Sequence, residues 1–270
     1  MNVTLNQSEI EHAAEALHRA ERERRQIDPV SLTYRNATLD DAYAIQKAWV
    51  DRKVADGRKV IGYKIGLTSR AMQASMQIDE PDYGVLLDDM IFSDGAEIKV
   101  EQFLDPRIEV ELAFVLKDRL FGDNVTICDV LNATDYVVPA IEIIAARSHR
   151  VHPQTGYTRK LVDTVADNAA NAGIIMGGRP IRPLDVDLRW VGALCYLNGV
   201  LEETGLAAGV LNHPANGICW VARRFAPHDV ALLPRQVILA GSFTRPVKVA
   251  AGDTVHVDFG PLGGISCHFV

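Results

Sequence analysis

Apolar residues recur at three- and four-residue intervals in two stretches near the N-terminus, which is the period of a helix with one buried face. In the first stretch they are Ile10, Ala13, Ala14, Leu17 and Ala20. The residues SEIE at 8–11 have the form of a capping box and predict the start of this helix. A second helix is predicted to start at Thr38 and to end before Gly57. Its buried stripe is Ala42, Ile45, Trp49 and Val54. Residues 1–57 are therefore predicted to form a small helical segment.

After this segment the pattern changes to short apolar runs of strand length. The stretch VIGYKIGLTS at residues 60–69 predicts a strand followed by a turn, and RAMQASMQ at residues 70–77 predicts a third helix. From Tyr83 onward short strands dominate, with few helices between them. This succession excludes a doubly wound parallel sheet and indicates an α+β chain in which residues 58–270 form a β-rich domain.

The C-terminal half carries a clear hairpin signal. Residues 188–204 hold two strand-like runs joined by Asn198-Gly199, the dipeptide that favours a type I′ turn. Residues 213–226 predict a helix with Asn212 as its N-cap. Residues 236–270 then read as three further strands separated by a loop and a turn.

Composition and charge restrict the class of protein. At 270 residues and 48% hydrophobic, the chain can bury a substantial core. The 28 basic and 35 acidic residues give a net charge of −7, which argues against nucleic acid and anionic membranes as partners. The N-terminus lacks the features of a signal peptide, so we expect a cytoplasmic protein. The cysteines lie far apart, as expected of buried free thiols in a reducing compartment, and are Cys128, Cys195, Cys219 and Cys267.

Two carboxylates interrupt the apolar run DPRIEVELAFVL at residues 105–116. Glu109 and Glu111 are two residues apart, so in a strand they point to the same face, while Ile108 and Val110 point to the other. Like charges roughly 6 to 7 Å apart in an apolar setting repel and resist ionisation unless a cation lies between them. A divalent metal would remove that repulsion. The alternative is a solvated edge strand with two exposed glutamates.

A third acid, Glu142, lies inside the apolar run VVPAIEIIAAR. It could be an inward-facing acid hydrogen-bonded to backbone, or a third ligand. Three carboxylates in hydrophobic strands are a typical site for Mg²⁺ or Mn²⁺ with positions left for a chelating substrate. The absence of histidine and cysteine nearby argues against zinc.

Five stretches together resemble the hydratase and decarboxylase branch of the fumarylacetoacetate hydrolase superfamily, and the similarity runs through nearly the whole chain. They are GYKIGLTSRAMQASMQIDEPDYGVLLDDM, PRIEVELAFVL, ATDYVVPAIEII, DTVADNAANAG and AGVLNHPANG. The resemblance implies a mixed β roll or sandwich of that superfamily's C-terminal type, and a homo-oligomer. It also implies that Mg²⁺ or Mn²⁺ is bound by Glu109, Glu111 and Glu142.

The same resemblance implies further site residues. It places Lys64 in the active site and the loop at residues 79–84 over the substrate. The K-x-x-D-T pattern is matched by Lys160 and Asp163, although some hydratases of this branch lack the lysine. The loop GSFTRP at residues 241–246 would bring Ser242 and Thr244 to the 2-oxo acid end of the substrate.

The activity that the resemblance implies is a metal-dependent hydro-lyase acting on a small molecule. It would add water to a seven-carbon 2-hydroxydienedioate in the breakdown of aromatic compounds, without an organic cofactor. Three alternatives stay open: decarboxylation of a six-carbon 2-oxo-3-hexenedioate, hydration of 2-hydroxypenta-2,4-dienoate, and a noncatalytic partner subunit of a hydratase and decarboxylase complex.

Individual roles can be assigned only as hypotheses. Lys64 is expected to donate a proton with a pKa lowered by the nearby dication, the alternative being a structural salt bridge to a glutamate. Asp82 is a candidate base, or else a turn residue after Pro81. Arg245 could bind the far carboxylate of a diacid, but the sequence does not rank it against its rivals, which are Arg107, Arg147 and Lys160. The residues His149, His152 and His213 are expected to be surface or capping residues.

Overall fold

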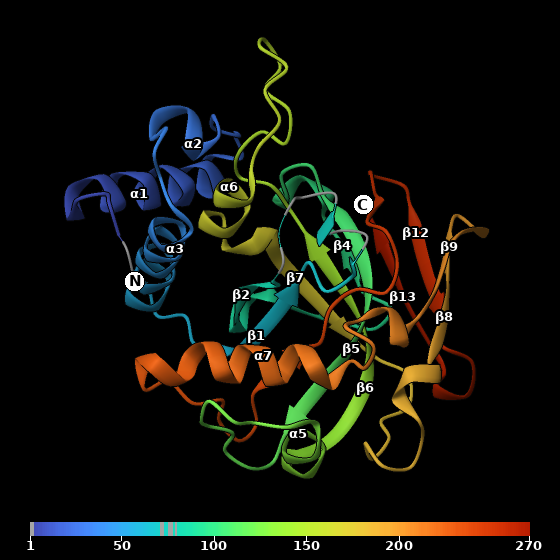
Figure 1. The fold of residues 1–270 in the computed structure, drawn as a ribbon. Helices are drawn as coiled ribbons and strands as arrows, with labels where there is room; N and C mark the ends of the chain where they lie inside the picture. The colour runs from blue at the N-terminus through green and yellow to red at the C-terminus, as the bar shows by residue number, and fades with distance from the viewer. Residues whose placement is uncertain (1–2, 71–72, 75–77, 79) are drawn as a thin grey trace.

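The computed structural model describes residues 3–70, 73–74, 78 and 80–270. Helices and strands are mixed, with a small helical part at the N-terminus and two sheets beyond it (Figure 1), as predicted for an α+β chain. The helices are α1 (Gln7–Glu23), α2 (Val30–Thr33), α3 (Leu39–Ala55), α5 (Ile127–Ala133), α6 (Leu161–Ala166) and α7 (Ala215–Phe225). Most of the helix predicted at residues 70–77 falls outside the described residues. Within the described part of the chain, no helix is long and apolar enough to cross a membrane.

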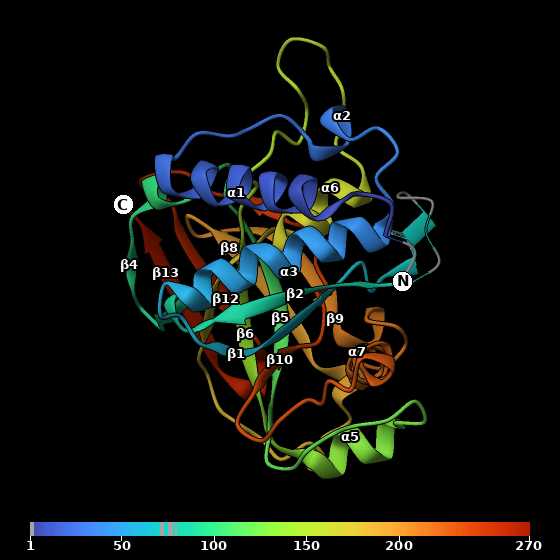
Figure 2. The same cartoon turned by 90° about the vertical axis from the view of Figure 1, so that its left-hand side faces the viewer.

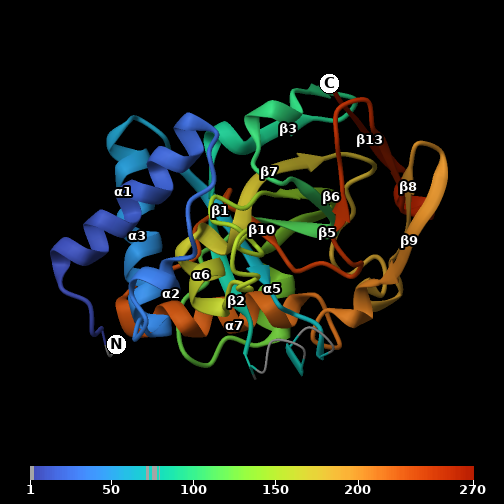
Figure 3. The same ribbon diagram turned by 90° about the horizontal axis from the view of Figure 1, so that it is seen from above.

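The larger sheet has eight strands in the order β2-β1-β10-β5-β6-β7-β3, and β11 also pairs with β5. Its strands are β1 (Val60–Gly66), β2 (Asp82–Leu87), β3 (Ile91–Ser93), β5 (Arg107–Leu116), β6 (Thr134–Ile144), β7 (Asn171–Met176), β10 (Val237–Leu239) and β11 (Val247–Lys248). The smaller sheet has five strands in the order β4-β13-β12-β8-β9. These are β4 (Glu97–Ile98), β8 (Gly192–Leu197), β9 (Val200–Leu206), β12 (Thr254–Asp258) and β13 (Gly264–Phe269). Seen from above, the helical part and the smaller sheet lie at opposite sides of the larger sheet (Figure 3).

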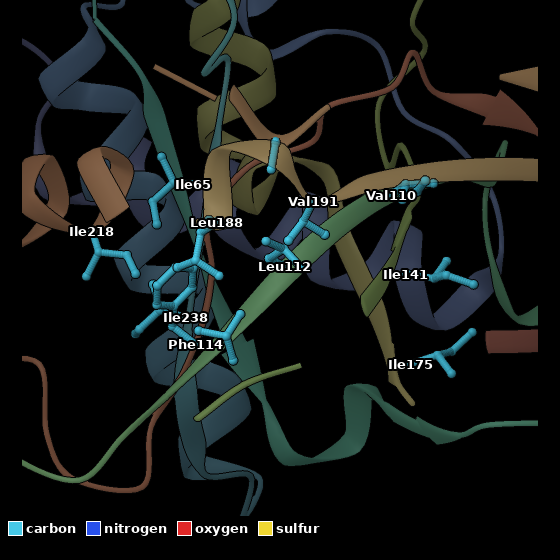
Figure 4. Close-up of a cluster of buried hydrophobic side chains, with 14 of the residues drawn as sticks. Ile65, Val110, Leu112, Phe114, Ile141, Ile175, Leu188, Val191, Ile218 and Ile238 are labelled. Carbon is cyan, nitrogen blue, oxygen red and sulfur yellow. The ribbon is translucent and has the colours of Figure 1, made fainter. Parts of the chain in front are cut away.

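The two faces of β5 enter two different hydrophobic cores. Val110, Leu112 and Phe114 are fully buried in a cluster that also holds Val257 of β12 and Ile218 of α7 (Figure 4). Residues of the other face belong to a second cluster with members from β2, β7 and β10, which are Leu86, Ile174 and Leu239. Since these strands lie apart in the sheet order, the larger sheet must curl around its inner face. Glu109 and Glu111 lie on that inner face.

The N-terminal helices form as their periodicity predicts, with two differences. The capping box of α1 uses Asn6, whose Oδ1 accepts from the Glu9 N–H at 3.0 Å, so Ser8 lies inside the helix and is not its cap. The cap of α3 is Thr38, as predicted. Val54, expected on the buried stripe, is 45% exposed because the last turn of α3 extends beyond the packed region.

The helical segment packs directly onto the rest of the chain. Helices α1 and α3 cross over β1 and β2 (Figure 2), and their buried side chains share a cluster with Val85, Leu87 and Val165. Because this core includes residues beyond 57, the division of the chain at that residue stays a prediction.

The predicted hairpin is present, with Asn198 and Gly199 at positive φ between β8 and β9. The prediction of Asn212 as the N-cap of α7 is wrong. Asn212 belongs to the preceding turn, with φ of 68°, and the ring Nδ1 of His213 accepts from the Ala215 N–H at 3.1 Å. The cysteines are free thiols as expected, but Cys128 is exposed because it begins the surface helix α5.

Candidate metal centre and active site

Three glutamates converge on the inner face of the larger sheet. Glu109 and Glu111 alternate along β5, and the antiparallel register places Glu142 of β6 opposite Glu109. One oxygen of each lies within 4.8 Å of the others. Glu111 and Glu142 are buried, and Glu109 is half-buried. This all-oxygen set has the donor chemistry that a hard cation such as Mg²⁺ or Mn²⁺ requires.

Neighbouring groups orient two of these carboxylates and leave an oxygen of each for a cation. Glu142 Oε1 accepts a hydrogen bond from Asn171 Nδ2 at 2.8 Å. Glu142 Oε2 is buried, has no hydrogen-bond partner among the described residues, and lies 3.4 Å from Lys64 Nζ. Glu111 Oε2 accepts from the Gly241 N–H at 2.8 Å. The buried Glu142 oxygen that accepts no hydrogen bond is the observation that most directly fits a metal ligand, because buried oxygens rarely lack a hydrogen bond.

Lys64 lies on β1 and is 4% exposed. Burial by itself would lower the pKa of this ammonium, but the charges of Glu142 and Asp82, with those of the two β5 glutamates, outweigh burial and raise the pKa above its ordinary value. This rise results from four carboxylates around one ammonium, a sum that the sequence does not reveal. The lowering expected from the sequence assumed a dication beside Lys64, so it stays a prediction.

The carboxylates themselves resist ionisation. Burial raises the pKa of Glu109 to about 7, with Lys64 opposing the rise and Glu142 adding to it. Burial and the neighbouring Glu142 raise the pKa of Glu111 well above its ordinary value. In the absence of a cation, the cluster therefore holds protons at pH values where an exposed glutamate would be ionised.

Asp82 begins β2, where it pairs with Gly66 of β1. Its side chain is buried, its Oδ1 has no hydrogen-bond partner among the described residues, and burial raises its pKa. A Cβ placed on Gly66 would lie 2.2 Å from Asp82 Oδ1 and 3.1 Å from Lys64 Nζ, so only glycine fits between these groups. Residues 82–84 of the predicted covering loop are thus strand, and residue 79 lies outside the described residues.

A cavity of about 360 Å³ opens beside Glu109 and Glu111. Its walls include residues 66–69 after β1 and residues 242–246 after β10. Ser242 Oγ donates to the Thr244 carbonyl at 3.0 Å and accepts from the Thr244 N–H at 3.2 Å, which holds both residues at the wall. The cavity gives a small molecule access to the carboxylates.

Comparison with known proteins agrees with this arrangement. The chain is 61% identical to the 2-oxo-hept-4-ene-1,7-dioate hydratase of Escherichia coli over 95% of this chain and 96% of that protein. It is 37% identical to the 2-keto-4-pentenoate hydratase of Paraburkholderia xenovorans, covering 96% and 94%. The solved 4-oxalocrotonate decarboxylase from Pseudomonas putida G7, complexed with magnesium and adipate, superposes with a TM-score of 0.94 at 34% identity, covering all of both chains. No family model matches the chain.

The chain belongs to the hydratase and decarboxylase branch of the fumarylacetoacetate hydrolase superfamily. It is an enzyme of the lyase class, as relatives named as hydratases indicate. Because hydratases and a decarboxylase of this branch share length and fold with the chain, the fold does not separate hydration from decarboxylation.

Two residues that the superfamily pattern suggested have structural contacts instead. Both carboxylate oxygens of Asp163 are occupied: Oδ1 accepts from the Ser31 N–H, and Oδ2 accepts from Ser31 Oγ and the Lys160 N–H, each at 2.7 Å. Lys160 is the N-cap residue of α6, and its ammonium lies 6.0 Å from the ring centroid of Tyr157. These contacts give Asp163 a capping role and do not support substrate binding by this residue.

Two arginines that were candidates for binding the substrate's far carboxylate lie in different surroundings. Arg245 is at the cavity wall, but its side chain is 82% exposed and forms an ion pair with Glu203 at 2.5 Å. Arg147 is buried, donates to Asp167 Oδ1 at 2.9 Å, and lies 4.8 Å from the ring centroid of Trp49. Arg147 therefore anchors the helical segment and is not available to a substrate.

Three contributors were not singled out from the sequence. Asn171 and the Gly241 N–H each donate to a glutamate of the cluster. Asn168 bonds both the N–H and the carbonyl of Val85 on β2, from a run of three residues at positive φ. Asn171 could have been found in the sequence, because in DNAANAG it is a polar residue at the start of an apolar run. The Gly241 N–H could not, because a backbone donor is common to nearly all residue types.

Proposed function

We propose that the protein is a divalent-metal-dependent hydratase that adds water to 2-oxohept-4-ene-1,7-dioate, giving 4-hydroxy-2-oxoheptane-1,7-dioate in the breakdown of aromatic compounds. The observation that carries the proposal is the 61% identity to a hydratase named for this substrate, over 95% of the chain. The cluster of Glu109, Glu111 and Glu142 with Lys64 supports it, because a noncatalytic subunit would have no need to keep four titratable groups together in an apolar setting.

The metal would be held by the three glutamates, and Mg²⁺ is our first choice because the related decarboxylase structure contains magnesium. Bound there, the ion would supply Lewis acidity toward the 2-oxo acid end of the substrate. The hydroxyl residues Ser242 and Thr244 line the cavity beside the cluster and would hold that end in place. The backbone N–H of Gly241 keeps Glu111 aimed inward.

Lys64 and Asp82 would carry out the proton transfers of the reaction. Hydration of a dienol requires a proton at C5 and loss of the enol proton, followed by addition of water across C3 and C4, with the hydroxyl group at C4 and the proton at C3. Lys64 stays charged because of the surrounding carboxylates, so it would stabilise negative charge on the substrate or donate a proton to it. Asp82 has a raised pKa and an unpartnered oxygen, which suits a group that takes up and returns a proton.

The test is turnover of 2-hydroxyhepta-2,4-dienedioate with Mg²⁺, followed by loss of the dienol absorbance, product mass and released CO₂. Gain of one water without CO₂ supports the hydratase. Release of CO₂ would instead favour the decarboxylase, the second candidate, which the TM-score of 0.94 supports. The variant Glu109→Gln should lose activity, whereas Glu101→Gln, a change to an exposed glutamate, should not. Full activity in Glu109→Gln would contradict the metal site.

We also propose that the enzyme is a cytoplasmic homo-oligomer. Its four cysteines are free thiols, as in proteins of reducing compartments. The edge strand β9 exposes three apolar side chains, which are Val200, Leu201 and Leu206. Light scattering on Val200→Lys should give a smaller particle than on the unmodified enzyme, and a monomer in both cases would contradict this proposal.

A further inference from the structure

The face of β5 that carries the two glutamates continues to an arginine. Arg107 lies two residues before Glu109, so both point to the same side of the strand. Around it gather Arg150 and Arg159 from the segment after β6. Arg150 Nε donates to Asp105 Oδ2 at 2.8 Å, and Arg107 Nη2 lies 4.0 Å from the same oxygen. We call Arg107, Arg150 and Arg159 the arginine cluster.

The arginine cluster has more donors than acceptors. Arg107 Nε and Arg150 Nη2 are buried and have no hydrogen-bond partner among the described residues. The side chain of Arg159 is 8% exposed, and its carboxylate contact is Asp167 Oδ2 at 3.5 Å. Asp167 also forms an ion pair with Arg147, with Arg147 Nη1 lying 2.9 Å from Asp167 Oδ1. Each guanidinium has five N–H donors and no acceptor, and the Arg107 side chain is 36% exposed, so the cluster can accept a further anion from outside.

The electrostatics of the cluster agree with its crowding and with the position of Arg107 two residues before Glu109. Burial, together with the neighbouring charge of Arg150, lowers the pKa of Arg159 to about 10. Burial raises the pKa of Glu109 and of Asp82, and the charges of Arg150 and Arg159 respectively oppose that rise. An anion placed among the arginines would relieve their mutual repulsion at the border of the site.

The length of a seven-carbon diacid matches this placement. Six bonds separate its two carboxyl carbons, and six backbone bonds also separate the Cα atoms of residues i and i+2 in a strand, a step of roughly 7 Å. A diacid whose 2-oxo acid end lies at Glu109 and Glu111 therefore reaches about one such step along the strand. In the direction of Arg107 that step ends at the arginine cluster.

We propose that the arginine cluster binds the far carboxylate of the substrate and sets the preference for a diacid over a monoacid. The inference rests on the proposed hydratase function and deepens it. Arg147 is committed to Asp167, and Arg245 is exposed and paired with Glu203, so neither competes for this role. The residues Arg150 and Arg159 are thereby specificity determinants that the sequence pattern did not mark.

The experiment compares kcat/KM for 2-hydroxyhepta-2,4-dienedioate and for the monoacid 2-hydroxypenta-2,4-dienoate, both with Mg²⁺. Arg159→Gln and Arg150→Gln should each lower kcat/KM for the diacid by about 30-fold or more, mainly through KM, as for removal of one partner of a buried charged pair. For the monoacid the change should stay within about threefold. Arg159→Lys should recover part of the loss. Arg182→Gln, a change to an exposed arginine, is the matched control.

Inhibitor binding can be measured even for variants that lose all turnover. Heptanedioate, a saturated seven-carbon diacid, should inhibit the unmodified enzyme but not Arg159→Gln, while 2-oxopentanoate should inhibit both. Equal losses on both substrates with both inhibitors still bound would overturn the inference, as would a diacid-selective loss in Arg245→Gln alone. If the unmodified enzyme turned over neither dienoate, the proposed function itself would fail; turnover of both with no selective loss in the variants would refute only the arginine cluster.

Discussion

Metal removal should produce an enzyme whose free energy of unfolding falls as the pH rises from about 5 to 8. The reason lies in Glu109 and Glu111, whose pKa values are raised in the folded protein by burial and by neighbouring carboxylates. Between the unfolded and folded pKa values, the folded protein binds more protons than the unfolded chain. Stability is then lost as the pH increases through that interval.

The size of the effect follows from the shift of Glu109. A rise from 4.5 to about 7 corresponds to about 3 kcal/mol at 1.36 kcal/mol per pKa unit, lost between roughly pH 4.5 and 7. Lys64 adds no slope in this interval, since its raised pKa keeps it charged in both states throughout. A dication between the carboxylates favours their ionised forms, so Mg²⁺ should stabilise the protein more strongly as the pH rises.

Urea denaturation of the chelator-treated enzyme at pH 5.5, 6.5 and 7.5, with and without Mg²⁺, measures both effects. Glu109→Gln should flatten the pH dependence of the metal-free protein, because an amide cannot ionise. Glu101→Gln should leave it unchanged. A metal-free stability that rises with pH across this range, or a slope in Glu109→Gln as steep as in the unmodified protein, would refute the electrostatic account of the cluster; a smaller slope from Glu111 is expected to remain.

Three further substitutions test the supports of the site. Gly241→Ala should lower the free energy of unfolding by about 2 to 5 kcal/mol in urea, because φ is 122° and the new Cβ would lie 2.3 Å from Thr68 Oγ1. Asn171→Leu should weaken Mn²⁺ binding in calorimetry and cost about 1 to 3 kcal/mol, since Glu142 loses a donor. Arg147→Leu should cost about 3 to 5 kcal/mol in thermal unfolding, because the buried Asp167 loses the nearer of its ion-pair partners, Arg159 lying at 3.5 Å.

Gly241→Ala has a matched comparison. Gly252→Ala places a methyl group in open space at a similar φ of 92°, so it reports the backbone cost without the clash. Equal losses in Gly241→Ala and Gly252→Ala would contradict the clash with Thr68. Unchanged Mn²⁺ affinity in Asn171→Leu would remove that residue from the support of the metal site.

The features predicted well from the sequence depend on neighbours along the chain. The α1 and α3 periodicity, the Asn198-Gly199 turn and the inward pairing of the β5 glutamates follow from local geometry. The wrong predictions depend on tertiary neighbours. Asn212 was a plausible cap, but the fold places it in a left-handed turn. The raised pKa of Lys64 likewise depends on a sum over four carboxylates from three strands, which the sequence does not reveal.

The position of Glu142 in the site depends on strand register, which the sequence alone does not specify. Glu142 is a candidate ligand from its composition alone, but it reaches Glu109 only because β5 and β6 pair with these two residues opposite each other. Opposed side chains in an antiparallel pair lie roughly 5 Å apart, which suits two ligands of one ion. A slip of one residue would turn Glu142 to the face that holds Val110, placing an unpaired charge in the apolar core. The register that buries the core is therefore the same register that assembles the site.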